Sequence, residues 1–367
     1  DGGLTSGELY LLYGAHLAAA DAADDTLNGT SDGVIYLEHA NLDLGDGFAG
    51  YHFNGADAGD QAGISVASAG DVDGDGQADL LVGATVAGPG TLPPGGAYLL
   101  YGADLAAADA ADDTLNGTRD GVIDLANANT AVIEGFSGYQ FIGANSQDAA
   151  GVSVSSAGDV DGDGQADLLI GANVADGGGN ASGEAYLLYG ANLATADLAD
   201  GTTDGVITLD QISATSLTGS IAGYQFVGAE GDQAGISVAS AGDVDGDGQA
   251  DLLVGAYLAD GGGASSGEAY LLYGAQLAAL DAADGAANGV IGLDHTTDLF
   301  VVGSSGDDTI NASFTDAQGN KIDNAAVDGT NADVVLAGAG DDTVAAGAAN
   351  DTVYGDAGND TLAGAEI

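Results

Sequence analysis

The chain has 367 residues, and its 57 Asp and Glu residues against only two Lys and Arg give a formal net charge of −55. This charge excludes nucleic acid as a partner and opposes binding to anionic membrane surfaces. Hydrophobic residues still make up 45% of the sequence, which predicts a folded protein and not an acidic disordered one. The longest apolar runs are far too short to span a bilayer, so we expect no membrane insertion.

The sequence begins at Asp1 with no visible signal peptide, and we expect it to be a mature or trimmed piece of a longer protein. There is no cysteine, which excludes disulfides and thiolate metal sites. Glycine contributes 65 residues, more than twice its usual share, as expected of a chain with many tight turns.

An internal repeat organises residues 1–298. The motif YLLYGA begins at four positions spaced 88, 88 and 84 residues apart: Tyr10, Tyr98, Tyr186 and Tyr270. One unit contains, in order, an aromatic run such as GYQFIGA, a GISVASAG run, an acidic loop, an ADLLVGA run, a Gly-rich loop, a GEAYLLYGA run, an acidic Ala-rich insert and a GVITLD run.

These short runs predict β-strands, because they are rich in Val, Ile, Leu and Tyr and are bounded by Gly, Asp or Asn. Only the insert, for example at residues 102–118, has helix-forming composition, and it predicts one short helix per unit. About four antiparallel strands per unit favour the blades of a β-propeller.

The acidic loop DVDGDGQAD has carboxylates at its positions 1, 3, 5 and 9, Gly at 6 and Gln at 7. This spacing matches the first part of an EF-hand loop, in which oxygen ligands wrap a hard cation and Gly permits the sharp turn. In the first loop Val82 stands at position 12 in place of the bidentate Glu, so the aspartate at position 9 would have to close the site. Oxygen-only ligands favour Ca²⁺ over transition metals.

A solvated polar turn is the alternative interpretation of such a loop, but its recurrence at the same place in three units favours calcium. The predicted ligands are Asp71, Asp73, Asp75, Gln77 and Asp79; Asp159, Asp161, Asp163, Gln165 and Asp167; and Asp243, Asp245, Asp247, Gln249 and Asp251.

The stretch GISVASAGDVDGDGQADLLVGA resembles the FG-GAP repeat of integrin α-subunit propellers and of many bacterial surface proteins. The resemblance covers residues 1–298 and implies β-propeller-like blades, calcium in the acidic loops and a role in binding or adhesion. Two features depart from the family: AGIS or AGVS replaces the Phe-Gly pair, and the acidic insert lengthens each unit.

From about Leu299 the repeat becomes nine residues long. Its aspartates are each followed two positions later by Val or Leu, and GSSGDDTIN, which contains Asp308, is an outlying copy. The pattern resembles the RTX nonapeptide G-G-x-G-x-D-x-U-x of proteins exported by type I secretion from Gram-negative bacteria. The resemblance implies a short parallel β-roll, secretion before folding, and calcium at Asp308, Asp333, Asp342, Asp351 and Asp360.

We therefore expect an all-β chain with FG-GAP β-propeller-like blades at 1–298 and an RTX-like β-roll at 299–367. The blade region divides into a half repeat at 1–47 and repeats at 48–134, 135–219 and 220–298. Three and a half units cannot close a propeller, which needs about four to eight blades. Either upstream blades are missing, or the open edge pairs with another molecule in a shared ring or a head-to-tail fibre.

We expect no enzyme. The four histidines do not recur in register through the repeats: His16, His39, His52 and His295. GASSG at 263–267 fits G-x-S-x-G but precedes a strand, whereas a nucleophile elbow precedes a helix. Carboxylate pairs suited to glycoside hydrolysis cannot be told from calcium ligands by sequence. Asp and Asn residues recur in the first two inserts: Asp24, Asp25, Asn28 and Asp32, and Asp112, Asp113, Asn116 and Asp120. They predict a solvated turn or a second cation site, and the turn is favoured because the third copy loses part of the pattern.

These features favour a secreted, calcium-binding, non-enzymatic adhesive or structural protein of the bacterial cell surface or biofilm matrix, self-assembling through open blade edges into a multimer or filament. Its further partners would be surface polysaccharide or another cell-surface protein. The alternatives are an accessory repeat module of a secreted polysaccharide-acting enzyme, and a spacer that holds another domain away from the cell.

Overall fold

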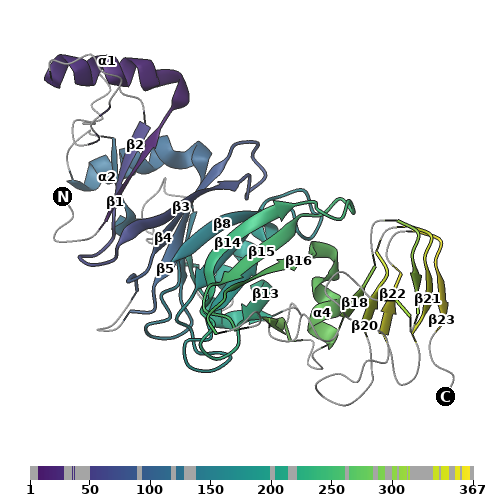
Figure 1. The fold of residues 1–367 in the computed structure, drawn as a ribbon. Helices are drawn as coiled ribbons and strands as arrows, with labels where there is room; N and C mark the ends of the chain where they lie inside the picture. Colours follow the sequence, from purple (N-terminus) through teal and green to yellow (C-terminus); the bar gives the residue numbers. More distant parts are fainter. Residues whose placement is uncertain are drawn as a thin grey trace.

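The computed structural model describes residues 7–28, 35, 37, 50–88, 93–116, 121–127, 138–198, 203–213, 221–260, 264–283, 288–293, 300–303, 306–311, 313–314, 334–338, 340–346, 352–355 and 358–363. Within these residues the chain consists mostly of strands, with short helices, as predicted. Figure 1 shows the sheets following one another from helix α1 at one end of the molecule to a roll of parallel strands at the other. No helix of the described part is long and apolar enough to cross a membrane.

Two sheets are complete blades of the same plan, each with four strands that pair antiparallel in chain order. We number the four sheets of this region blades 1 to 4 in chain order. Blade 2 consists of β3 (Ala62–Gly70), β4 (Asp79–Ala84), β5 (Gly96–Leu100) and β7 (Gly138–Ile142). Blade 3 consists of β8 (Ser153–Gly158), β9 (Asp167–Ala172), β10 (Glu184–Leu188) and β13 (Ile221–Val227).

In the part of the chain that the structure describes, the two outer blades are partial. Blade 1 has the strands of the third and fourth positions, β1 (Glu8–Leu12) and β2 (Gly50–Asn54). Blade 4 has those of the first three positions, β14 (Ala234–Gly242), β15 (Asp251–Ala256) and β16 (Glu268–Leu272). Blade 1 is therefore a half blade, formed by β1 of the predicted half repeat and β2 of the next repeat.

The aromatic strand closes blades 1, 2 and 3. In sequence it stands first in the unit, but β7 pairs with β5 and β13 pairs with β10, which belong to the preceding unit. The borders between blades consequently lie one strand after the borders between the sequence repeats.

Each acidic insert begins with the predicted helix, and the helices are α1 (Leu17–Asn28), α2 (Leu105–Asn116), α3 (Leu193–Asp197) and α4 (Leu277–Ala283). Three inserts continue into short strands, β6 (Val122–Asp124), β11 (Val206–Thr208) and β17 (Val290–Gly292). These strands pair parallel with the outer strand of the preceding blade: β6 with β2, β11 with β7 and β17 with β13. A second short strand, β12 (Ile212–Ser213), also pairs parallel with β13. The inserts therefore cover strand edges that would otherwise be exposed.

Paired leucines in the central strands pack each blade against both of its neighbours. Adjacent residues of a strand point to opposite faces of the sheet. Leu168 of β9 accordingly packs in one core with Leu81 of blade 2, and Leu169 packs in another core with Leu252 of blade 4. A sheet buried on both faces requires continuous apolar runs, which explains why the central strands read DLLVGA and AYLL.

The C-terminal strands form the predicted parallel β-roll (Figure 1). One sheet contains β18 (Phe300–Val302), β20 (Val334–Leu336) and β22 (Thr352–Tyr354), and the other contains β19 (Thr309–Ile310), β21 (Thr343–Ala345) and β23 (Thr361–Ala363). All neighbouring pairs in both sheets are parallel. Val335 and Val344 fill the core, whereas Leu362 on the last strand is exposed.

Candidate metal sites

Each acidic loop connects the first two strands of a blade. In blade 2 the loop runs from Asp71 to Asp79, between β3 and β4. Its glycines adopt left-handed backbone conformations, with φ of +78° at Gly74 and +91° at Gly76. Such φ values strain any residue with a Cβ atom, so Gly at loop position 6 is required by the turn, as predicted.

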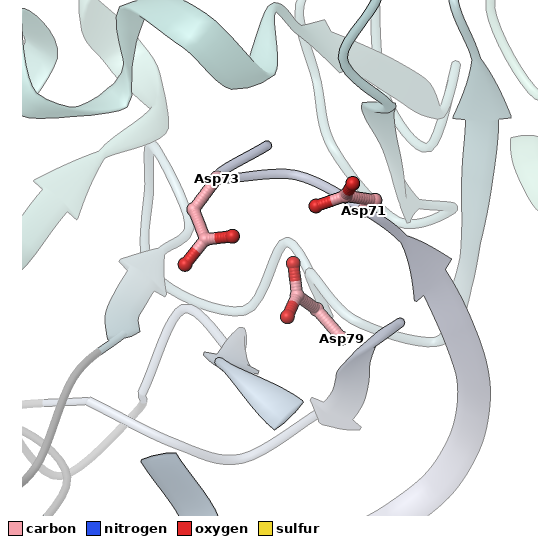
Figure 2. A group of neighbouring side chains, drawn as sticks. All are labelled: Asp71, Asp73 and Asp79. Atoms are coloured by element: carbon pink, nitrogen blue, oxygen red, sulfur yellow. The ribbon is translucent and has the colours of Figure 1, made fainter. Parts of the chain in front are cut away.

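The loop brings three carboxylates together. Figure 2 shows the side chains of Asp71, Asp73 and Asp79 directed toward one another from the two ends of the loop. One oxygen atom of each residue lies within 4.8 Å of the others, and the same grouping recurs in both later loops: Asp159, Asp161 and Asp167, and Asp243, Asp245 and Asp251. This is the arrangement of ligands around a hard cation.

The last aspartate of each group is fixed by two backbone donors. The Val72 N–H donates to Asp79 Oδ2 at 2.8 Å, and the Gly102 N–H donates to Asp79 Oδ1 at 2.9 Å. Asp167 accepts the equivalent bonds from Val160 and Gly190 at 2.8 and 2.9 Å. This residue therefore ties the loop to the turn that follows the third strand.

The geometry of Asp71 supports a bound cation. Its Oδ2 accepts the Gly76 N–H at 2.9 Å, while its Oδ1 is buried and has no hydrogen-bond partner. A buried carboxylate oxygen without a partner is costly. A cation among the three carboxylates would supply the missing interaction, so the residues present fit Ca²⁺.

The aspartate at loop position 5 is not part of the group of three carboxylates in any of the loops: Asp75, Asp163 and Asp247. Asp75 Oδ1 accepts the Gln77 N–H at 2.7 Å, and Asp163 and Asp247 make the same bond to Gln165 and Gln249 at 2.8 Å. Their role as calcium ligands stays a prediction.

Neighbouring loops are joined to one another. The Ala166 N–H of the second loop donates to the Asp71 carbonyl at 2.9 Å, and the Ala250 N–H of the third loop donates to the Asp159 carbonyl at 2.8 Å. The order of one loop therefore depends on the order of the next.

Burial disfavours the charged form of the last aspartate in each group. It raises the pKa of Asp167 to about 7, and neighbouring Asp161 and Asp163 add repulsion in the same direction. Burial also raises the pKa of Asp79 and of Asp251. A divalent cation would reverse this effect, because it favours the charged form of each ligand.

In the roll, successive coils stack their aspartates. Asp342 Oδ1 accepts the Asp308 N–H at 2.7 Å, and Asp360 Oδ1 accepts the Asp342 N–H at 2.9 Å. Asp342 is buried, its Oδ2 has no hydrogen-bond partner, and burial raises its pKa. Among the described residues, these aspartates do not form a group of three neighbouring carboxylates. Asp333 and Asp351 lie outside the described residues.

The insert holds a structural aspartate that the sequence did not single out. Asp197 Oδ1 accepts the Gly205 N–H at 2.9 Å, and Asp281 Oδ1 accepts the N–H groups of Asn288 and Gly289 at 3.0 and 2.8 Å. These bonds close the loop before the parallel strand. The recurrence LAAAD, LATAD, LAALD was the available signal. Of the residues considered for a second cation site, only Asp112 and Asp113 have described side chains, and Asp112 is buried.

The remaining candidate residues that the structure describes form no shared site. His16 is exposed, and the His52 ring stacks on Tyr10 with ring centroids 4.4 Å apart. Ser265 of the G-x-S-x-G stretch lies in a turn before β16, with φ of +50°. His39 and His295 lie outside the described residues.

Two family models match the chain. The FG-GAP repeat matches residues 62–100, 150–188 and 234–272, each from the first to the third strand of one blade. The RTX calcium-binding nonapeptide repeat matches residues 328–362 in four copies, and RTX repeats are typical of secreted proteins. No curated protein matches the chain. The chain is therefore built from three FG-GAP repeats followed by RTX calcium-binding nonapeptide repeats.

Proposed function

We propose that this protein is a secreted, calcium-binding, non-enzymatic adhesive or structural component of the bacterial cell surface or extracellular matrix, which self-assembles through its open blades. One observation carries the proposal: a group of three carboxylates recurs at the same place in three successive blades. The RTX repeats add a second class of calcium-binding unit on the same chain.

The charge of the chain supports a calcium-rich location. At a formal net charge of −55, the compact state repels itself, most of all within the loops where carboxylates converge. Calcium at millimolar concentration, the range that extracellular modules of this kind bind, would relieve that repulsion. Low cytosolic calcium would keep the chain unfolded for export, and folding would follow outside the cell.

Two strand edges support self-assembly. Among the described residues, β16 pairs only with β15, whereas the equivalent strands β5 and β10 pair on both sides. At the other end, β1 pairs with β2 alone in the described part of the chain. Exposed strand edges promote association with other chains.

The test is calcium-dependent attachment by the purified chain. We would coat beads with the wild-type protein and with the triple variant Asp79→Asn, Asp167→Asn, Asp251→Asn, then measure binding to cells and to isolated surface polysaccharide with calcium and with chelator. Calcium-dependent attachment by the wild type and its loss in the triple variant are expected. Wild-type beads that bind no better in calcium than in chelator contradict the adhesive role.

Turnover of the polysaccharide would contradict the non-enzymatic role. The measurement is the release of new reducing ends by the wild-type chain in calcium. The expected result is no release above the background given by a heat-denatured sample. Release that persists through purification would support the alternative of a module that belongs to a polysaccharide-acting enzyme.

A further inference from the structure

Each blade has two apolar faces, and the structure shows how they fit together. We call the face toward the following blade its trailing face and the opposite face its leading face. The trailing face carries one Val from the acidic loop and one Leu from each of the next two strands. The leading face carries a Tyr and a Leu from the third strand, a Leu at the start of the insert helix and a Leu after the short strand.

The same junction is built twice within the chain. Between blades 2 and 3, a single core unites Val72, Leu81 and Leu99 with Tyr186, Leu188, Leu193 and Leu209. Between blades 3 and 4, the equivalent core unites Val160, Leu169 and Leu187 with Tyr270, Leu272, Leu277 and Leu293. All these side chains are buried. One set of positions therefore always packs against the other.

At blade 4 the trailing face is uncovered. Val244, Leu253 and Leu271 are 53%, 38% and 39% exposed. The described strands of the C-terminal roll, which follows blade 4 in the chain, do not cover them. Their counterparts in blade 3, Val160, Leu169 and Leu187, have no exposed surface.

At blade 1 the leading face is uncovered. Leu17 and Leu37 are each 42% exposed, whereas the equivalent Leu105 and Leu125 of blade 2 are 4% and 0% exposed. Tyr10 and Leu12 of β1 supply the other two positions of this face, packed beside Ala20 of α1. Blade 1 thus has all four positions that define a leading face.

We propose that the trailing face of blade 4 in one molecule binds the leading face of blade 1 in a second copy of this chain, head to tail. The inference rests on the proposed function and gives its self-assembly a specific interface. The 367-residue chain carries, uncovered, the two halves of a junction that it already forms internally. Because the two faces differ, every added copy leaves one of each free, which produces a filament or, if the rotation closes, a ring.

A half blade is sufficient to make such a junction. Among the described residues, blade 1 consists of β1 and β2, without strands in the first two positions. Leu9 and Leu11 nevertheless pack against the core that holds Tyr98 and Leu100 of blade 2. The outer half of a blade therefore provides enough apolar contact to seat a neighbour.

Calcium should control the contact, because the third acidic loop is part of it. Val244 lies within that loop, between Asp243 and Asp245. At the junction between blades 3 and 4, the corresponding Val160 lies against Gly274. A Cβ atom added to Gly274 would be 3.1 Å from a methyl carbon of Val160. A disordered loop could not present Val244 in this position, so removal of calcium would dissolve the assembly.

The test uses the 367-residue chain in millimolar calcium, measured by analytical ultracentrifugation and electron microscopy. Wild-type protein is expected to form filaments or rings. Leu271→Glu on the trailing face and Leu17→Glu on the leading face should each weaken self-association by about 30-fold or more, as for a residue at the centre of an interface. Leu198→Glu is the matched control, because Leu198 is exposed but lies outside both faces.

Mixing the two variants distinguishes this arrangement from a symmetric one. Leu271→Glu keeps an intact leading face and Leu17→Glu keeps an intact trailing face, so an equal mixture should form heterodimers that grow no further. If blade 4 instead bound blade 4 of a second copy, the Leu17→Glu variant would form dimers without the other variant.

Three results overturn the inference: a wild-type chain that stays monomeric in calcium, filaments of Leu271→Glu equal to those of wild type, or a variant mixture without heterodimers. The second result would leave calcium-dependent self-assembly standing and reject only the interface. Calcium-induced thermal stabilisation of each variant, measured in parallel, shows that its blades are folded.

Discussion

Leu187 and Leu271 occupy the same position in consecutive blades, but Leu187 is fully buried and Leu271 is 39% exposed. The difference arises because blade 4 covers the first residue and no described part of the chain covers the second. This pair offers a direct measure of how much the packing between blades stabilises the fold.

Leu187→Ala should lower the free energy of unfolding by about 2 to 5 kcal/mol, since it removes a fully buried side chain and leaves a cavity. Leu271→Ala should change the stability of the isolated molecule by less than about 1 kcal/mol, because its side chain is already partly solvated. Urea unfolding in calcium, at a protein concentration that keeps the chain monomeric, checks both values. Equal losses for the two variants would mean that blades 3 and 4 do not pack as described.

Asp167→Asn should weaken both the fold and the cation site. The two oxygens of Asp167 accept the N–H groups of Val160 and Gly190. An amide turns its NH₂ group toward one of these donors, which costs about 1 to 3 kcal/mol in calcium-free protein. Calcium titration should show one site fewer than in wild type. Asp176→Asn, an exposed change outside the acidic loops, is the control and should retain every site.

The stability of the calcium-free protein should fall as pH rises. Burial raises the pKa of Asp167 to about 7, whereas an unfolded aspartate titrates near about 3.9. Between these values the folded state holds more protons than the unfolded state, so each rise in pH favours unfolding. The melting temperature in chelator should decrease from about pH 4 to pH 7 and then level off. A melting temperature that rises with pH over this window would contradict the burial of these carboxyls.

Calcium should reverse that pH dependence. The cation binds the charged carboxylates and must displace protons from Asp167 below about pH 7. Calcium binding should therefore release protons, about one proton per ion at the second site near pH 6. The affinity for calcium should also increase as pH rises from about 6 to 8. Calorimetry in two buffers of different ionisation enthalpy measures this release. Binding without proton release at pH 6 would show that the site is already charged.

Asp342→Ala should destabilise the roll and leave the blades intact. The change removes the carboxylate that accepts the Asp308 N–H, a loss of about 1 to 2 kcal/mol. Hydrogen exchange should show faster exchange in β19 and β21 and unchanged exchange in β9 and β10. Faster exchange in the blades as well would indicate that the two regions unfold together.

Local spacing made the acidic loops predictable. Ligands at alternate positions and Gly76 at the sharp turn follow from the geometry of a short cation-binding loop, and the structure brings Asp71, Asp73 and Asp79 together. The nine-residue period likewise accounts for Val335 and Val344 in the core of the roll, because a coil of fixed length returns the same position to the core. Leu362 holds the same position on the last strand but is exposed.

Long-range pairing was not predictable in the same way. The aromatic strand β7 joins β5 of the preceding unit, a choice set by packing around the whole blade and not by its own residues. The three-residue strand β6 is too short for any pattern to indicate its parallel partner β2. Similarly, Asp197 recurs at the end of LAAAD, LATAD and LAALD, but that recurrence does not indicate its bond to the Gly205 N–H.

Calcium titration of the metal-free 367-residue chain, followed by calorimetry together with the melting temperature, tests the central claim most directly. Three groups of converging carboxylates predict saturable binding of at least three ions in the millimolar range or tighter, with a large rise in melting temperature and one site lost for each of Asp79→Asn, Asp167→Asn and Asp251→Asn. A chain that binds no calcium, or whose melting temperature is the same in calcium and in chelator, would contradict the account.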